Sequence, residues 1–352
     1  MNVAPVEVLL VGCGAFAHRY HVPAFREDAA VRIAGIFDPR ASDATRALAA
    51  SYGAPLVDRI DSLPATAGTA FALVTTPHTM HAAHVDVVLD RGLDVLVDKP
   101  FVMHAADARR LAARADGAHR VNGVAYNRRF DAGCLRAREI VASGGIGAVR
   151  LVQTVQLGYE RAGWFLVPAL GGGGPYTGRA SHMADLVPWL LGRRPTRLRS
   201  RLRTSDPARS DHGGFIELQF DELECQMTCI EEGWHMWDEI RIFGEDGLVE
   251  LRRPLTAPIG WSLAWHRSRG GEVEAMAADT RPGGATRDFL RAVRERSRPE
   301  CTFADAVSSV EIVELAFDSA RRGGEWLDLG IGPSGPKTAG TSPADHERRR
   351  SP

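Results

Sequence analysis

The feature that most constrains the fold is an apolar run that leads directly into a glycine-rich turn. Residues Val6–Val11 are typical of a short buried β-strand. Gly12 and Gly14 follow, and a helical pattern comes next. This order is typical of a dinucleotide-binding unit, in which Gly12 permits the tight turn and Gly14 lets the backbone approach a pyrophosphate. The first amides of the helix, including those of Ala15 and Phe16, are expected to face the phosphates.

A second predicted strand, Val31–Phe37, ends in an acidic residue. Asp38 follows Ala17 at about the 20-residue distance at which an acid hydrogen-bonds the ribose diol of NAD. Arg40, two residues further on, could instead hold the 2′-phosphate of NADP. The pattern therefore favours NAD and leaves NADP open.

A third apolar run, Phe71–Thr75, also ends in polar residues. Thr76, Pro77 and His81 follow it, and they would face the same crevice as Gly12 because parallel strands end at one edge of a sheet. They are candidates for lining the cofactor. The alternative is that Thr76 or His81 only caps the helix predicted to begin near Thr79.

The next predicted strand, Leu93–Asp98, is followed by an unusual lysine. Of the 43 Lys and Arg residues, only Lys99 and Lys337 are lysines. A bias toward arginine explains the rarity, but not the survival of one compact ammonium at a strand end, where its chemistry differs from that of a guanidinium. Asp98 and Lys99 are therefore candidate site residues.

The chain divides into two patterns, which predict two domains. A helix at Ala105–Ala115 and a strand at His119–Val124 complete a βα alternation typical of a doubly wound parallel (Rossmann) sheet over residues 1–124. Residues 125–331 instead contain a string of predicted strands and two closing helices, typical of an α+β domain with a mainly antiparallel open sheet. Residues 332–352 lack periodicity and predict a disordered tail.

Composition narrows the function classes. The 352 residues carry a net charge of −1 and 44% hydrophobic residues, which implies no attraction to nucleic acid or to an acidic membrane. The five cysteines are scattered without paired metal spacing, so no metal is expected. With no signal-peptide pattern, a reducing cytoplasm is expected.

Four motifs together resemble one family, the glucose–fructose oxidoreductase, inositol dehydrogenase and rhizopine catabolism (Gfo/Idh/MocA) group of nicotinamide-dependent sugar and cyclitol oxidoreductases. They are Gly12-Cys13-Gly14-Ala15-Phe16-Ala17, Thr76-Pro77-His78-Thr79-Met80-His81, Asp98-Lys99-Pro100 and Asn127-Arg128-Arg129-Phe130. The resemblance implies that Lys99 lies between nicotinamide and substrate and donates to the reacting oxygen. It also implies that the second domain covers the nicotinamide and forms a homo-oligomer, a dimer or tetramer, through its sheet.

A second chemical segment starts at the glycine run 171–174. The helix predicted near Ala180 would project His182 and Asp185 from neighbouring turns, and an imidazole can accept a hydroxyl proton near neutral pH. The family has an aspartate four residues before this histidine, whereas this chain has Gly178. Asp185 could orient the imidazole instead, or it could have a structural role of its own.

Four further residues are candidate substrate contacts. Tyr176 or Arg179 could replace the missing acid, Asn127 follows the last strand of the first domain, and Trp164 shortly precedes the glycine run. An aromatic face suits the C–H surface of a sugar ring.

The main functional hypothesis is an NAD(P)-dependent dehydrogenase or reductase that moves hydride to or from a secondary alcohol or ketone of a sugar, cyclitol or related polyol. Lys99 would polarise the oxygen and His182 would carry its proton. Two alternatives remain open, the first of them because Gly178 replaces an acid. One is a regulator that binds cofactor and sugar without turnover, and the other is a lyase or hydrolase with an internal redox cycle.

Overall fold

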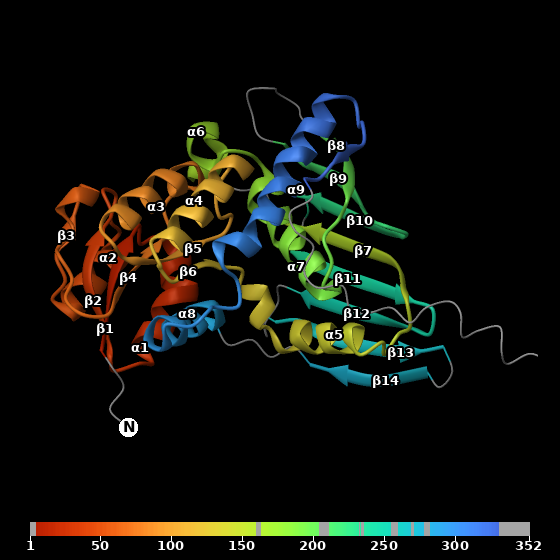
Figure 1. Ribbon diagram of the computed structural model, residues 1–352, viewed down its shortest axis with the longest axis horizontal. Coiled ribbons are helices and arrows are strands. Elements are labelled where there is room, and N and C mark those ends of the chain that lie inside the picture. The colour runs from red at the N-terminus through yellow and green to blue at the C-terminus, as the bar shows by residue number, and fades with distance from the viewer. Residues whose placement is uncertain are drawn as a thin grey trace, which may run out of the picture.

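The computed structural model describes residues 5–159, 163–203, 211–231, 233, 236–254, 260–268, 271–277 and 282–330. These residues form two domains built on separate sheets, one on the red-to-orange side of Figure 1 and one on the green-to-blue side. The predicted tail, residues 332–352, lies outside the described residues.

The first sheet is parallel and has the strand order β3-β2-β1-β4-β5-β6. Its strands are β1 (Val6–Val11), β2 (Val31–Phe37), β3 (Leu56–Val57), β4 (Ala70–Val74), β5 (Asp94–Asp98) and β6 (Asn122–Ala125). The order reverses between the neighbours β1 and β4, and ligands of such sheets bind outside the carboxyl ends of the strands at this reversal. The predicted Rossmann architecture is confirmed.

Helices cover both faces of this sheet, as alternate residues of β1 show. Leu9 and Val11 pack with α3 (His81–Asp90) and α4 (Ala105–Gly117), whereas Val8 and Leu10 pack with α1 (Val22–Arg26) and α2 (Asp43–Tyr52). The helical segments of this part are a π-helical turn (Ala17–His21), α1 (Val22–Arg26), α2 (Asp43–Tyr52), 3-10 turns at Ile60–Ser62 and His78–Met80, α3 (His81–Asp90) and α4 (Ala105–Gly117).

The second sheet is mainly antiparallel, as predicted, with β7 and β10 as its parallel pair. In the described residues its order is β14-β13-β12-β11-β7-β10-β9-β8-β15. The strands are β7 (Val149–Leu157), β8 (Arg197–Leu202), β9 (Gly213–Phe220), β10 (Leu223–Ile230), β11 (Trp237–Gly244), β12 (Gly247–Pro254), β13 (Ser262–Arg267), β14 (Gly271–Met276) and β15 (Leu327–Asp328).

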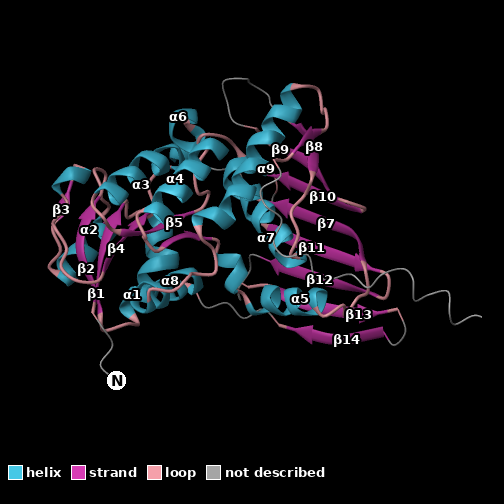
Figure 2. Ribbon diagram, viewed as in Figure 1, coloured by secondary structure: helices cyan, strands magenta, loops and turns pink. Residues whose placement is uncertain are grey.

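Helices pack against one face of the second sheet (Figure 2). The helical segments of this half are a 3-10 turn (Asn127–Phe130), α5 (Ala132–Ala142), a 3-10 turn (Gly163–Leu166), α6 (Pro168–Gly171), a π-helical turn (Tyr176–Ala180), α7 (Ser181–Leu191), α8 (Gly284–Glu295) and α9 (Phe303–Arg321). On the other face Val155 is 37% exposed and Phe215 is 39% exposed. Among the described helices, none is both long and apolar enough to cross a bilayer.

The two closing helices connect the domains. Phe289 and Val293 of α8 pack in the core of the first sheet, although α8 follows the second sheet in the chain. Helix α9 packs Phe303 against the first domain and Ile312 against the second. The residue limits of the domains remain a prediction, and α8 lies with the first sheet, outside the predicted range of that domain.

Several elements were not anticipated from the sequence. The missed elements are the strands β3, β13, β14 and β15 and the helices α2 and α5. The short β3 and β15 have two residues each, too few to show a period.

Candidate active site

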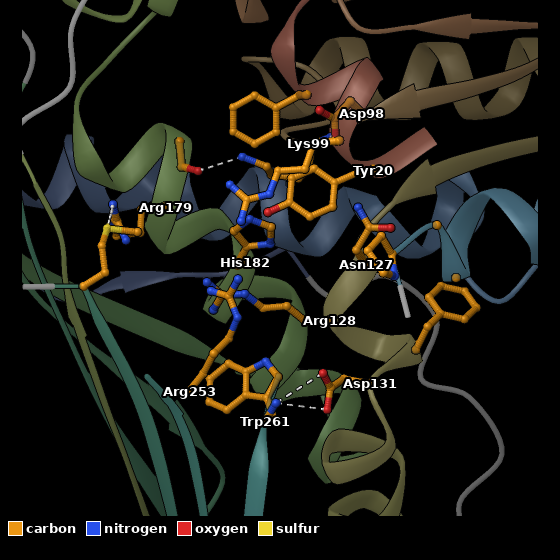
Figure 3. Close-up of a pocket in the computed structure, with 18 residues that line it drawn as sticks. Tyr20, Asp98, Lys99, Asn127, Arg128, Asp131, Arg179, His182, Arg253 and Trp261 are labelled. Carbon is orange, nitrogen blue, oxygen red and sulfur yellow. Dashed lines mark hydrogen bonds between the residues drawn. The ribbon is translucent and has the colours of Figure 1, made fainter. Parts of the chain in front are cut away.

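A cavity of about 230 Å³ lies between the two domains, beyond the carboxyl end of β5 (Figure 3). Residues of both halves line it, and the predicted Phe16, Asp98, Lys99, Asn127, Arg179 and His182 are among them. The other lining residues are Arg19, Tyr20, Arg128, Phe130, Asp131, Gly178, Met236, Arg253, Trp261, Pro282, Gly283 and Gly284.

Lys99 enters the cavity from the first domain. The five residues of β5 are all buried, the strand ends at Asp98, and Lys99 and Pro100 follow directly. The Lys99 ammonium donates to the carbonyl oxygen of Gly178 at 3.0 Å and lies 5.2 Å from the centre of the Phe16 ring. Its backbone amide donates to Asp98 Oδ1 at 2.8 Å. Lys99 therefore spans the gap between the domains and contacts Gly178, the position at which the family resemblance predicts an aspartate.

His182 reaches the same cavity from the first turn of α7. Burial lowers the pKa of its imidazole well below the ordinary value of 6.5. Four cations lower this pKa further, namely Arg128, Lys99, Arg253 and Arg179. The imidazole is consequently neutral at neutral pH and can accept a proton. Its Nδ1 is buried and has no hydrogen-bond partner in the part of the chain that the structure describes.

Asp185 does not orient His182, which corrects one sequence-based expectation. Its two carboxylate oxygens instead accept hydrogen bonds from Arg129 Nε at 2.9 Å and Arg129 Nη2 at 2.5 Å. Burial disfavours the guanidinium, but the charge of Asp185, its hydrogen bonds to Arg129 and the nearby Asp305 together raise the pKa of Arg129. Asp185 is thus one half of a buried ion pair that joins α7 to the turn after β6.

The four predicted substrate contacts separate into two groups. Asn127 and Arg179 line the cavity, and Arg179 Nε lies 3.5 Å from Glu231 Oε1. Tyr176 is fully buried in the core of the second domain instead. Trp164 stacks on Phe165, with ring centres 3.8 Å apart, and is not among the described lining residues. Tyr176 is therefore corrected to a core residue.

The glycine run before His182 packs closely against other parts of the protein. A Cβ atom at Gly174 would lie 2.0 Å from the Asp211 carbonyl oxygen. The buried Asp211 carboxylate accepts hydrogen bonds from the amides of Gly174 at 3.0 Å and Gly213 at 2.9 Å. In this structure the glycines allow tight packing that positions α7, whereas the sequence suggested an approach to a ligand.

Two arginines at the far end of the cavity were not predicted from the sequence as site residues. Arg128 follows β6 and Arg253 lies on β12. Both bind the fully buried Asp238 of β11, since Arg128 Nη2 and Arg253 Nη1 lie 2.8 Å and 3.0 Å from its Oδ2. Arg128 was visible within a family motif, but Arg253 belongs to no motif. Trp261, also missed, lies next to them, 5.4 Å from the Arg128 guanidinium.

The predicted cofactor crevice lies at the carboxyl ends of β1, β2 and β4. Gly12 has φ +85°, and an added Cβ would lie 2.9 Å from the Thr76 amide nitrogen, so only glycine fits this turn. A Cβ at Gly14 would meet no atom within 4 Å, which leaves room beside the backbone. Asp38 Oδ2 accepts a hydrogen bond from the Cys13 amide at 3.1 Å, so the acid is held beside the glycine turn.

The other cofactor candidates differ in how accessible they are. Ala15, Phe16 and Arg40 are exposed and Pro77 is half-buried. The buried Thr76 places its hydroxyl 2.9 Å from His84 Nδ1. His81 is 1% exposed, and its two ring nitrogens each lie 2.8 Å from a backbone carbonyl oxygen, that of Pro100 or Thr76. His81 therefore braces the ends of β4 and β5 and has no ring nitrogen left for a cofactor.

Taken together, the crevice fits a dinucleotide. The obligatory glycine turn, the open space at Gly14 and the acid at the end of β2 are the features that a pyrophosphate and a ribose diol require.

Comparison with known families agrees with this fit. A family model described as "Oxidoreductase family, NAD-binding Rossmann fold" matches residues 6–126. A second model, described as "GFO/IDH/MocA C-terminal domain", matches residues 134–250.

Individual relatives share about a quarter to a third of their residues with this chain over the aligned segments. The rhizopine catabolism protein MocA of Rhizobium meliloti is 27% identical over 328 residues, which cover 89% of this chain and 94% of that protein. The 1-carboxy-3-chloro-3,4-dihydroxycyclohexa-1,5-diene dehydrogenase of Comamonas testosteroni is 30% identical over 217 residues, 60% of this chain and 54% of that enzyme. The similarity to the second relative thus spans about half of its length.

A solved structure shares the fold over nearly the whole chain. The aldose-aldose oxidoreductase of Caulobacter crescentus, complexed with glycerol, superposes with a TM-score of 0.81 at 21% identity and covers 92% of this chain and 100% of that one.

Proposed function

Because this chain belongs to the Gfo/Idh/MocA family of oxidoreductases, we propose that it transfers a hydride between a nicotinamide cofactor and a secondary alcohol or ketone of a sugar, cyclitol or related polyol. The observation that carries the proposal is the convergence of Lys99 and His182 on one cavity between the domains. The cavity of about 230 Å³ lies below the roughly 300–1,000 Å³ common for ligand pockets, which suits a single ring.

The two polar residues divide the work on the substrate oxygen. Lys99 donates a hydrogen bond to this oxygen and stabilises the negative charge that develops on it during oxidation. His182 accepts the hydroxyl proton at a ring nitrogen, which its lowered pKa permits because the imidazole starts neutral. In the reduction direction the same two groups polarise the carbonyl and return the proton.

The residues of the crevice would hold the cofactor. Gly12, Gly14 and the helix start at Ala15 and Phe16 would bind the pyrophosphate, and Asp38 would bind the ribose diol of NAD. The bound nicotinamide supplies the hydride acceptor or donor. Thr76 and Pro77 would border it from the end of β4.

A homo-oligomer is also part of the proposal. Among the described residues no helix covers one face of the second sheet, and the exposed Val155 and Phe215 on that face suit contact with a second copy of the chain. Light scattering coupled to gel filtration measures the mass, and a Val155→Glu variant is expected to lower it.

The main experiment uses Lys99→Met. Loss of the ammonium is expected to lower turnover by about 10²–10³-fold, the usual effect of removing one such donor, while NAD⁺ binding stays unchanged. Rates are read as NADH and NADPH absorbance with myo-inositol, D-glucose and keto sugars, and cofactor binding is measured by calorimetry. Arg46→Met, which removes an exposed first-domain cation, is the control.

Each alternative function has its own outcome. Wild-type rates in Lys99→Met would overturn the assigned role of the lysine. NAD⁺ binding by the wild type without turnover of any substrate would instead identify a regulator. Product formation without NADH would identify an internal redox cycle.

A further inference from the structure

The cavity carries an excess of positive side chains. Its described lining includes the cations Arg19, Lys99, Arg128, Arg179 and Arg253 and the acids Asp98 and Asp131. Both acids already accept hydrogen bonds from backbone amides: Asp98 from that of Lys99 at 2.8 Å, and Asp131 from that of Trp261 at 3.3 Å. The lining therefore holds five cations and two acids. Two acids outside the lining lie against three of these cations: Asp238 against Arg128 and Arg253, and Glu231 against Arg179.

The excess is concentrated on Arg128 and Arg253, which we name the arginine pair. Both guanidiniums share the single carboxylate Asp238, which leaves one net positive charge on the three groups. The side chains of the pair are only 10% and 15% exposed. Burial lowers the pKa of Arg128 to about 10, and the positive Arg253 and Arg179 oppose the attraction of Asp238. A buried charge of this kind is stabilised when an anion binds beside it.

Trp261 adds an unused donor beside the arginine pair. It is 1% exposed and lines the cavity, and its indole Nε1 has no acceptor among the described residues. Buried polar atoms without a partner are rare in folded proteins. A ligand oxygen at this end of the cavity would satisfy this N–H group together with the guanidiniums.

The position of His182 separates the two ends of the cavity. Figure 3 shows Lys99 on one side of the imidazole and the arginine pair with Trp261 on the other. A substrate whose reacting carbon lies between Lys99 and His182 would extend its far end toward the arginine pair.

We propose that the substrate is a sugar acid or carboxylated cyclitol, whose carboxylate binds Arg128 and Arg253 while its ring hydroxyl reacts at Lys99 and His182. This inference rests on the proposed function, because it assumes that the cavity holds the substrate. A carboxylate fits better than a phosphate ester, since the arginine pair and Asp238 together carry one net positive charge and a phosphate carries about −1.5 to −2 at pH 7. The fork of a guanidinium also matches the planar carboxylate.

The experiment compares substrates that differ only in the anionic group. D-glucuronate, D-galacturonate, D-glucose, D-galactose and D-glucose 6-phosphate are titrated into the NAD⁺-loaded protein by calorimetry, and their oxidation is followed by NADH absorbance. A uronate is expected to bind about 10–100-fold more tightly than its neutral partner, the usual range for hydrogen bonds to a charged group.

Three variants locate the effect. Arg253→Met is expected to remove most of this preference, because it raises Kd and KM for the uronate more than for the neutral sugar. Arg253→Lys keeps the charge and should retain part of the preference. Arg252→Met is the matched control, because Arg252 is exposed on the same strand and pairs with Glu250. Thermal unfolding checks that each variant is folded.

The opposite change is Gly178→Asp, which adds a carboxylate to the cavity. It is expected to weaken the uronate more than the neutral sugar, because the added charge repels the substrate anion and offsets the cations.

The outcomes separate this inference from the proposed function. Three results would overturn the proposed carboxylate site. They are equal binding of the uronate and the neutral sugar, an equal effect of Arg253→Met on both, and tighter binding of the phosphate ester. Uronate binding that depends on Arg253 but gives no NADH supports the carboxylate site and counts against the proposed function. Oxidation of neutral sugars alone supports the proposed function and overturns the inference.

Discussion

The two walls of the cavity hold their polar groups in different ways. On the first-domain wall Lys99 donates to the Gly178 carbonyl oxygen, and Asp98 accepts from a backbone amide. On the second-domain wall the arginine pair is held by the side chain of Asp238. Backbone partners do not change when side chains mutate, whereas a side-chain partner does. The first wall therefore suits a chemical step that all substrates share, the polarisation of the reacting oxygen. The second wall suits recognition of one particular substrate.

His182→Gln is expected to have the largest effect on the rate, because it removes the only second-domain group that we assign to proton transfer. General acid–base catalysis contributes about 10²–10⁴-fold, so kcat/KM for alcohol oxidation is expected to fall by that factor while NAD⁺ binding is unchanged. His104→Gln, in an exposed first-domain histidine, is the control. A loss below about threefold, far under that range, would remove His182 from the mechanism.

Asp185→Asn tests whether the buried ion pair of Asp185 with Arg129 contributes to the stability of the second domain and not to catalysis. The variant leaves Arg129 buried without its charged partner, and breaking such a pair costs about 3–5 kcal/mol of the free energy of unfolding. Chemical denaturation measures this value. Asp318→Asn, at a more exposed ion pair with Arg321, should cost about 1 kcal/mol or less. A large fall in kcat with unchanged stability would instead restore the orienting role for Asp185.

Asp38→Ala tests the cofactor side of the first domain. Loss of the carboxylate is expected to raise KM for NAD⁺ by about 10–100-fold, the range for hydrogen bonds to a charged group. Arg40→Ala provides the contrast, since it should leave the KM for NAD⁺ unchanged and weaken NADP⁺ only. The reverse pattern would identify NADP as the cofactor.

The smallest expected effect lies in the pH profile. Because the pKa of His182 is lowered, the imidazole remains neutral as the pH falls through 6.5, and the acid limb of kcat/KM for oxidation should lie below that value. Arg253→Met removes one nearby positive charge, so the pKa should rise and the limb should move toward 6.5 by about one unit or less, where one unit is 1.36 kcal/mol. Measurement with a neutral sugar avoids the change in carboxylate binding. An unmoved limb would show that Arg253 does not act on the imidazole.

Much of the fold could be predicted because its signals are local. The strands Val6–Val11, Val31–Phe37, Val149–Leu157 and Leu223–Ile230 coincide with observed strands, since an apolar run or an alternation is visible within each segment. The packing of α8 against the first sheet could not be predicted in this way. It depends on which sheet a distant amphipathic helix meets, and its own periodicity does not encode that choice.

The sequence alone determined the glycine turn at Gly12 and the acid at Asp38, and it identified Lys99 and His182 as site candidates. Each of these depends on backbone geometry at a strand end or a helix start, which neighbouring residues dictate. Only the tertiary structure decided that Asp185 pairs with Arg129, that Tyr176 is a core residue and that Arg253 meets Arg128 at Asp238. Arg128 and Asp238 are 110 positions apart in the chain, so the match between them is set by which strands lie side by side. Ion pairs form between residues that lie close together in space, and only the folded structure brings these residues together.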